Sequence, residues 1–377
     1  MPSNKKHHYV PKFYLRNFSL TDKTINIYNI DSDKNIVGGS LKDQCYVNRF
    51  YGKDSKIEYA FSLLEGAASR LIRTILEDNQ LPSEESTEYN SLLIFVVLQY
   101  GRTKYAADTN DEMLDKFFKT TYRDRLKRDN IKPTDFQVGL NDPIGLPLKI
   151  SATYWPIVRD LKAHLILNET EVEFITSDNP VTLYNKYCEK IKDRSSAGLG
   201  SVGLLIFFPL SPKALLLLYD GAVYKVGSRR SRSTLINDQN DIMVLNRLQW
   251  YNAMKNVYYH GLEQVSYMQR ESKSVKKRRV SHSNIQVREY LEKDDGTERE
   301  AVLHMYKSLL PMELNISFLK VQRRKKKVPM EKRLGSRDPE LLVLLDEFSE
   351  LVRKGYYKGS EFGLFIRDKK LTLHSAD

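Results

Sequence analysis

The chain has 377 residues, of which 41% are hydrophobic and 29% are charged, and its formal net charge is +12. This length and composition are typical of a globular protein with at least one large core, and they exclude a disordered chain. We expect no membrane span, because no run approaches ~18 apolar residues, and no secretory signal. With only two cysteines, Cys45 and Cys188, we expect no disulfide framework and a reducing, cytoplasmic location.

Most of the excess positive charge follows residue 270. Residues 271–377 hold 24 lysines and arginines against 17 acidic residues, a net charge of +7, whereas the first 270 residues carry +5. Such charge predicts binding of nucleic acid through phosphate neutralisation, and a solvated surface is the alternative. The candidate nucleic-acid-binding residues form two runs: Lys276, Lys277, Arg278 and Arg279, then Arg323, Arg324, Lys325, Lys326 and Lys327.

The first notable segment in chain order is residues 7–18. A disordered basic leader would be ordinary at this position, but these residues are rich in aromatic side chains and contain a proline that restricts the backbone. His7 and His8 stand at the edge of this segment. Histidine has the unperturbed pKa nearest neutrality, so the pair predicts acid/base or metal chemistry. The alternative is a lightly ordered tail with two solvated imidazoles.

The elements that follow alternate between strand and helix patterns. Apolar alternation predicts a strand over 24–30 with a turn at Gly38-Gly39, and apolar stripes predict helices over 58–78, 84–105 and 109–128. Pro156 predicts a short helix to about residue 163. Strands are expected over 172–175, 204–210, 214–218 and 314–321, and helices over 238–258 and 339–354.

These elements predict a mixed α+β class, with a helical subregion, a mostly antiparallel sheet and a basic C-terminal appendage. The apolar runs 204–210 and 214–218 are nearly continuous, which predicts a hairpin that is buried on both faces. We divide the chain into a body over 1–270 and a C-terminal region over 271–377. No internal repeat is present.

Two further polar groups are candidates for a site. Gln99 and Arg102 continue the apolar stripe of Leu92 and Phe95, so they should point into the protein or a cleft. Arg102 there needs an anionic partner, either an internal carboxylate or a substrate phosphate. Asp178, in a Thr-Ser-Asp-Asn-Pro segment after a strand, either presents a catalytic carboxylate or forms an Asx turn.

Other motifs are weaker or missing. Arg159 and His164 match the spacing used by helical ribonucleases of prokaryotic toxins, a match that chance alone produces about once in such a chain. P-loop, dinucleotide-binding, zincin and esterase signatures are absent from the sequence.

The segments 7–15, 99–103 and 174–181 together resemble a large bacterial family labelled domain of unknown function 4238. Residues 208–212 and the pair Asn246-Arg247 resemble later blocks of that family, and the likeness covers about residues 5–265. The resemblance implies that a set of polar side chains meets in the fold: His7, His8, Gln99, Arg102 and Asp178. It also implies a likeness to accessory or toxin-like proteins of prokaryotic defence, by analogy alone.

We therefore expect a nuclease that cleaves phosphodiesters, RNA rather than DNA, acting with a nucleic acid and with a defence-system partner protein. One histidine would be the general base or acid, and His7, His8 and Asp178 would hold Mg²⁺ or Mn²⁺ if a metal is used. Arg102 would stabilise the phosphate charge and Gln99 would orient it. Two alternatives stay open: a non-catalytic binding subunit whose polar cluster is an internal network, and a sensor that holds a small anion between Arg102 and His8.

Overall fold

The computed structural model describes residues 6–52, 55–192, 195–228, 230–278, 285–293, 299–307, 310–357 and 361–374. It has the predicted α+β architecture, with mostly antiparallel sheets. The α-helices are α1 (Lys12–Arg16), α2 (Ser55–Asp78), α3 (Thr87–Gly101), α4 (Lys104–Thr121), α5 (Arg123–Arg128), α6 (Gly145–Tyr154), α7 (Gln239–Asn252), α8 (Val265–Lys276), α9 (Arg323–Lys326), α10 (Pro339–Arg353) and α11 (Phe362–His374). Short 3-10 helices are η1 (Leu41–Asp43), η2 (Trp155–Val158), η3 (Leu262–Gln264) and η4 (Met330–Lys332).

The strands form two larger sheets and three strand pairs. A five-stranded sheet has the order β11-β5-β9-β8-β7, in which only the β11–β5 pairing is parallel, and a four-stranded sheet has the order β3-β2-β12-β6. β1–β4, β10–β15 and β13–β14 pair separately. The bounds are β1 (Lys6–His8), β2 (Thr24–Asn29), β3 (Lys34–Ser40), β4 (Tyr46–Asn48), β5 (Lys162–Asn168), β6 (Thr176–Ser177), β7 (Thr182–Tyr184), β8 (Leu205–Ser211), β9 (Ala214–Tyr219), β10 (Tyr224–Val226), β11 (Ser233–Ile236), β12 (Asn256–Tyr259), β13 (Ile285–Lys293), β14 (Arg299–Lys307) and β15 (Leu319–Val321).

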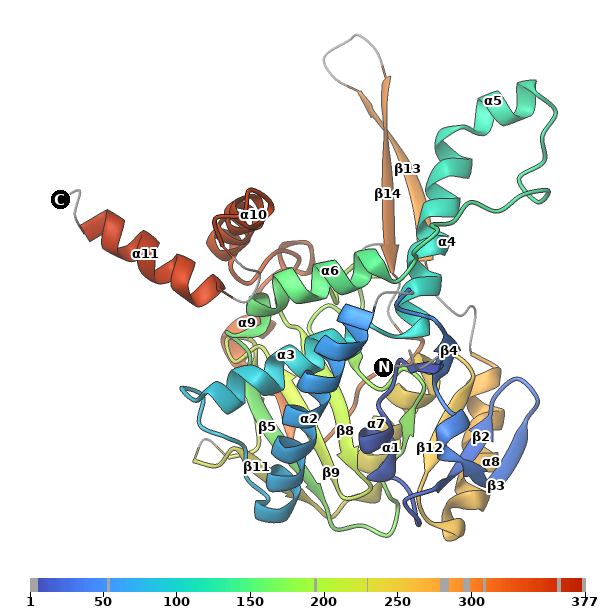
Figure 1. Ribbon diagram of the computed structural model, residues 1–377, viewed down its shortest axis with the longest axis vertical. Helices are drawn as coiled ribbons and strands as arrows, with labels where there is room; N and C mark the ends of the chain where they lie inside the picture. The colour runs from blue at the N-terminus through green and yellow to red at the C-terminus, as the bar shows by residue number, and fades with distance from the viewer. Residues whose placement is uncertain are drawn as a thin grey trace.

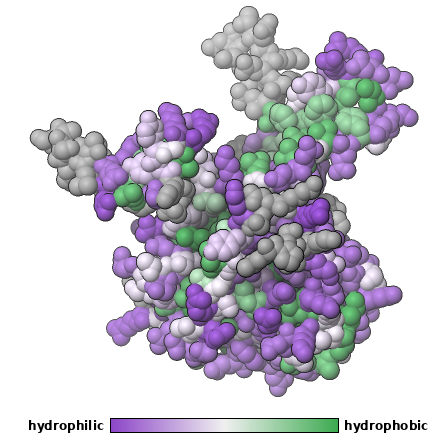
Figure 2. Space-filling model, viewed as in Figure 1, coloured by the Kyte–Doolittle hydropathy of each residue, from purple (hydrophilic) through white to green (hydrophobic). Residues whose placement is uncertain are grey.

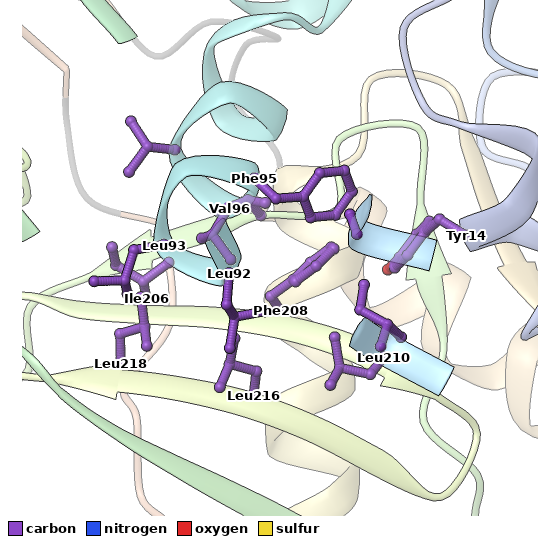
Figure 3. Close-up of a cluster of buried hydrophobic side chains, with 14 of the residues drawn as sticks. Tyr14, Leu92, Leu93, Phe95, Val96, Ile206, Phe208, Leu210, Leu216 and Leu218 are labelled. Carbon is purple, nitrogen blue, oxygen red and sulfur yellow. The ribbon is translucent and has the colours of Figure 1, made fainter. Parts of the chain in front are cut away.

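The hairpin β8–β9 lies in the centre of the fold and is buried on both faces, as predicted. Alternate side chains enter two different cores, because successive residues of a strand point to opposite faces. Ile206, Phe208 and Leu216 pack under α3 (Figure 3), while Phe207 and Leu217 enter the core on the other face. The α3 side of this contact is formed by Leu92, Leu93, Phe95 and Val96.

Several expected elements begin or end elsewhere. The helix expected over 84–105 is interrupted at Arg102, and Thr103 then caps α4 by accepting a hydrogen bond from the Ala106 N–H at 3.2 Å. Gly38 and Gly39 lie inside β3 rather than in a turn, at an irregularity where Gly38 has φ +65°. The helix over 238–258 ends at Asn252, and the chain continues into β12. Residues 172–175 are not a strand, and the strand over 314–321 is shortened to β15.

Gly101 allows α3 and α6 to approach closely. A Cβ atom on this residue would lie 1.9 Å from Ser151 Oγ and 3.0 Å from the carbonyl oxygen of Pro147. Only a residue without a side chain fits there, which explains the glycine between Gln99 and Arg102.

The region after residue 270 contributes to the same cores as the body. Leu314 and Leu319 belong to the core on one face of the five-stranded sheet, and Leu345 and Phe348 of α10 belong to the other. β15 also pairs with β10. A different part of the chain projects from this body: α4 and α5 form an arm beside β13 and β14 (Figure 1), with apolar residues along it and a hydrophilic tip (Figure 2). No helix in the described ranges is both long and apolar enough to cross a membrane.

Candidate active-site cleft

A cleft of about 420 Å³ lies between α2 and the N-terminal segment that contains β1 and α1. One face of α2 forms its first wall, because residues 58, 62, 65 and 69 recur at helical spacing. The opposite wall consists of His7, His8, Lys12 and Arg16. Two histidines, two carboxylates and several cations therefore border one cavity.

His7 is buried at the inner side of the cleft with a defined tautomer. β1 pairs with β4, and the ring of His7 stacks on Tyr51 with centroids 5.5 Å apart. The Tyr51 N–H donates to His7 Nδ1 at 3.1 Å, so in the neutral ring the proton resides on Nε2. His7 Nε2 lies 3.6 Å from Glu58 Oε2, which makes His7 a hydrogen-bond donor directed at the α2 wall.

His8 has the opposite tautomer. Its Nδ1 lies 2.9 Å from the carbonyl oxygen of Gln44, which can only accept, so Nδ1 carries the proton and Nε2 is the basic nitrogen. Burial, reinforced by the charge of Lys12, lowers the pKa of His8 to about 4. The ring is therefore neutral at physiological pH and able to accept a proton.

Three cations surround these histidines. Lys12 and Arg16 are one helical turn apart on α1, both are exposed, and neither has a carboxylate partner among the described residues. Lys6 also borders the cleft, although Asp43 binds its ammonium group at 2.7 Å. The cleft thus offers positive charge that is free to meet an anion.

Gln99 and Arg102 lie beneath the cleft and hold the N-terminal segment. Gln99 Nε2 and Arg102 Nε both donate to the carbonyl oxygen of Tyr9, at 3.0 and 3.1 Å. Arg102 also donates to Glu65 Oε1 at 2.7 Å and stacks over Phe61 at 4.6 Å. The anionic partner of Arg102 is therefore an internal carboxylate, and a small anion between Arg102 and His8 stays a prediction.

Asp178 does not border the cleft. It holds the segment that connects α7 to β12. Its Oδ1 accepts the N–H of Met254 at 2.8 Å, and its Oδ2 accepts those of Lys255 and Asn256 at 2.8 and 2.9 Å. The carboxylate is buried, with 3% of the residue exposed. These hydrogen bonds are not the expected Asx turn, because Asp178 accepts N–H groups from a distant part of the chain and not from its own turn.

The expected metal-ligand set of His7, His8 and Asp178 is not formed. Among the residues that the structure describes, no three His, Cys, Asp or Glu side chains come together to hold an ion. The physical reason is that Asp178 directs both carboxylate oxygens at backbone amides, while the histidines face α2 and Gln44.

The segment around Asp178 is held by amide side chains that sequence reasoning missed. Asn246, Gln249 and Asn252 lie at i, i+3 and i+6 on one face of α7. Gln249 donates to the carbonyl oxygen of Pro180 at 2.8 Å, and Asn252 donates to that of Asn179 at 2.6 Å. Asn246 accepts the N–H of Ile175 at 3.1 Å. The regular spacing of these three amides in the sequence could have indicated a polar helix face that binds backbone groups.

Glu58, Glu65, Lys12 and Arg16 were also missed as residues of the cleft. Charged residues at helical spacing on α2 and α1 are common on solvated faces, so their pattern carries no specific signal. The match of Arg159 and His164 to helical ribonucleases is wrong, because His164 lies in strand β5 and not on a helix with Arg159.

The two basic runs lie on separate parts of the body. Lys276 ends α8 and pairs with Asp33 at 3.3 Å, whereas residues 323–326 form α9 (Figure 1). Arg279 lies outside the described residues. The runs therefore do not form one continuous basic surface, and nucleic-acid binding by either stays a prediction.

The fold and the cleft define an α+β protein whose N-terminal histidine segment is anchored across the helical layer. The family described as protein of unknown function (DUF4238) matches residues 6–261, and the chain belongs to this family. The match begins at β1 and ends just after β12, so it contains the cleft, the Gln99–Arg102 contacts and the α7 amides. The resemblance inferred from the motifs is confirmed. No curated protein and no solved structure matches the chain.

Proposed function

We propose that the protein is a nuclease of the toxin-like effector class, and that it cleaves RNA in the cleft between α2 and the His7–His8 segment. The observation that carries the proposal is the pair of opposite tautomers: His7 offers an N–H, and His8 offers a basic nitrogen, beside Lys12 and Arg16. A base, a donor and cations in one cleft are the groups that phosphodiester cleavage requires.

The arrangement favours RNA for a chemical reason. His8 Nε2 would remove the proton of the 2′-hydroxyl, whose oxygen then attacks phosphorus. The bond from phosphorus to the 5′-oxygen breaks, and His8 returns the proton to that oxygen. Lys12 and Arg16 would neutralise the phosphate, and His7, held by the Tyr51 N–H, would donate its Nε2–H to the phosphate in place of Glu58. DNA lacks the hydroxyl that this route needs.

His8→Gln is expected to reduce RNA cleavage by at least about 100-fold, because a general base contributes roughly 10²–10⁴ to a rate. Labelled tRNA, mRNA and single-stranded and duplex DNA would be incubated with the purified protein in Mg²⁺, Mn²⁺ or EDTA. His260→Gln is the control, since His260, like His8, is half-buried, but it lies outside the cleft, where Glu173 is its neighbour at 3.3 Å. We expect cleavage to persist in EDTA, and cleavage that EDTA abolishes would replace the histidine route with metal chemistry.

The acidic limb of the pH–rate profile is expected near pH 4 rather than near 6.5, the ordinary pKa of histidine. The base must be unprotonated to act, so the rate falls only as the pH drops below its lowered pKa. Lys12→Gln removes one of the charges that lower this pKa, and it should move the limb upward. Measurement of kcat/KM between about pH 3.5 and 8 decides the matter, and a wild-type limb near 6.5 would exclude His8 as the base.

One observation favours a second candidate, a non-catalytic nucleic-acid- or partner-binding subunit. Gln99 and Arg102 fix the Tyr9 carbonyl, as a purely structural network would. This candidate predicts that no nucleic acid is cleaved under any condition, while salt-sensitive binding is retained in the folded His8→Gln variant.

A further inference from the structure

A second polar cavity lies at the end of the five-stranded sheet, away from the histidine cleft. It has a volume of about 570 Å³, within the range of sites for small molecules. Ala163 and His164 of β5 and Tyr219 of β9 form its base. None of the residues that border the histidine cleft borders this cavity.

The cavity is surrounded by unbalanced positive charge. Lys162, Lys225, Arg232 and Arg324 line it, and among the described residues Glu84 is the only carboxylate that does so. Burial, together with the charge of Arg232, lowers the pKa of His164 to about 4, so the ring adds no charge at neutral pH. The lining therefore carries a net charge of about +3, which calls for an anion of several negative charges.

Arg232 places its guanidinium in the wall of this cavity. Its Nη1 donates to the carbonyl oxygen of Pro82 at 2.7 Å, whereas Nε and Nη2 are buried and have no hydrogen-bond partner among the described residues. Glu84 approaches Nε only to 3.6 Å. The guanidinium therefore adds its positive charge from within the wall of the cavity.

The positions of the other cations are fixed by the fold. Lys225 lies directly opposite Lys320 in the β10–β15 pair, a like-charge neighbour that an anion would relieve. The stem of Lys162 lies over Gly221, where a Cβ atom would be only 2.8 Å from its Cδ. Gln322 donates to the Gly221 carbonyl oxygen at 2.8 Å, and this bond holds the start of α9 against the cavity.

We propose that this cavity binds a phosphorylated small molecule of nucleotide size, with Lys225 and Arg324 on its phosphates and the charge of Arg232 in the wall beside them. The site is independent of the proposed nuclease cleft. The site joins β10 and the segment before β11 to α9. Because α9 follows the part of the chain matched by the family, the C-terminal region completes the site. The cavity volume and its net charge favour a free nucleotide over a polynucleotide.

The test is calorimetric titration of the full chain with ATP, AMP, pyrophosphate, inorganic phosphate and a single-stranded oligonucleotide. Arg324→Gln is compared with Arg323→Gln: both residues are exposed on α9, both substitutions remove one charge, and only Arg324 lines the cavity. We expect Arg324→Gln and Arg232→Gln to weaken nucleotide binding at least about tenfold, and Arg323→Gln to change it less than about twofold.

Three outcomes would overturn the proposal. One is that no mononucleotide binds the wild type at millimolar concentration. Another is that Arg323→Gln and Arg324→Gln weaken binding equally, which means diffuse surface charge. The third is that only the oligonucleotide binds, with a steep loss of affinity as salt rises, which means a polynucleotide surface. Because Arg324 is exposed, its variant keeps the test valid even if Arg232→Gln does not fold.

Discussion

Asp178→Asn is expected to lower the free energy of unfolding by about 3–5 kcal/mol, although it changes only one atom of the side chain. The carboxylate accepts the N–H groups of Met254, Lys255 and Asn256 at 2.8–2.9 Å. An amide has one acceptor oxygen, so its NH₂ group would face an N–H donor and leave it unsatisfied in the interior. Urea denaturation followed by circular dichroism measures the loss.

The matched control is Asp238→Asn. Asp238 caps α7 by accepting the Asn240 N–H at 2.9 Å, and it is exposed. Asparagine is nearly as good an N-cap as aspartate, so this control should cost no more than about 0.5 kcal/mol. Equal losses in the two variants would mean that the three backbone contacts of Asp178 contribute little. If the Asp178→Asn protein were as stable as the wild type but had lost nuclease activity, Asp178 would have a role in catalysis.

The surroundings of Asp178 could be predicted from the sequence only in part. The sequence predicted a strand over 172–175 before Asp178, whereas the strand that precedes it is β6. The alternatives for Asp178 were a catalytic carboxylate and an Asx turn, and its observed contacts are with a distant part of the backbone. Its partners lie more than seventy residues later, at 254–256. A turn motif does not indicate which distant backbone meets it, so the choice between a catalytic and a structural carboxylate needed the fold.

The same limit applies to the rest of the fold and of the cleft. The buried hairpin β8–β9 and helix α10 were predictable, because long patterned segments reflect their own burial. The partner of Arg102 was not, since the Tyr9 carbonyl oxygen that its Nε contacts lies 93 residues away in the chain. Likewise His7 and His8 are conspicuous by residue type, whereas Glu58 is one charged residue among many until α2 lies across from them.

Arg102→Met is expected to cost about 3 kcal/mol of stability, because it removes the buried partner of a partly buried ion pair together with its hydrogen bond to the backbone. Arg102 is 1% exposed, and the change leaves Glu65 without this donor and the Tyr9 carbonyl oxygen with Gln99 as its only side-chain donor among the described residues. The His7–His8 segment should then be held less firmly on the helical layer. Trypsin would detect this as faster cleavage after Lys12 and Arg16, which lie on that segment.

A double-mutant cycle with Glu65→Gln separates the ion pair from the anchor. If Arg102 stabilises mainly by pairing with Glu65, the double variant should be more stable than the sum of the single effects by at least about 1 kcal/mol. Strict additivity would contradict the pairing. Tyr9 loses its arginine donor in both Arg102→Met backgrounds, so fast proteolysis of the segment should persist in the double variant even where global stability recovers. That separation would establish that Arg102 positions the histidines through the backbone, while the charge of Glu65 affects only stability.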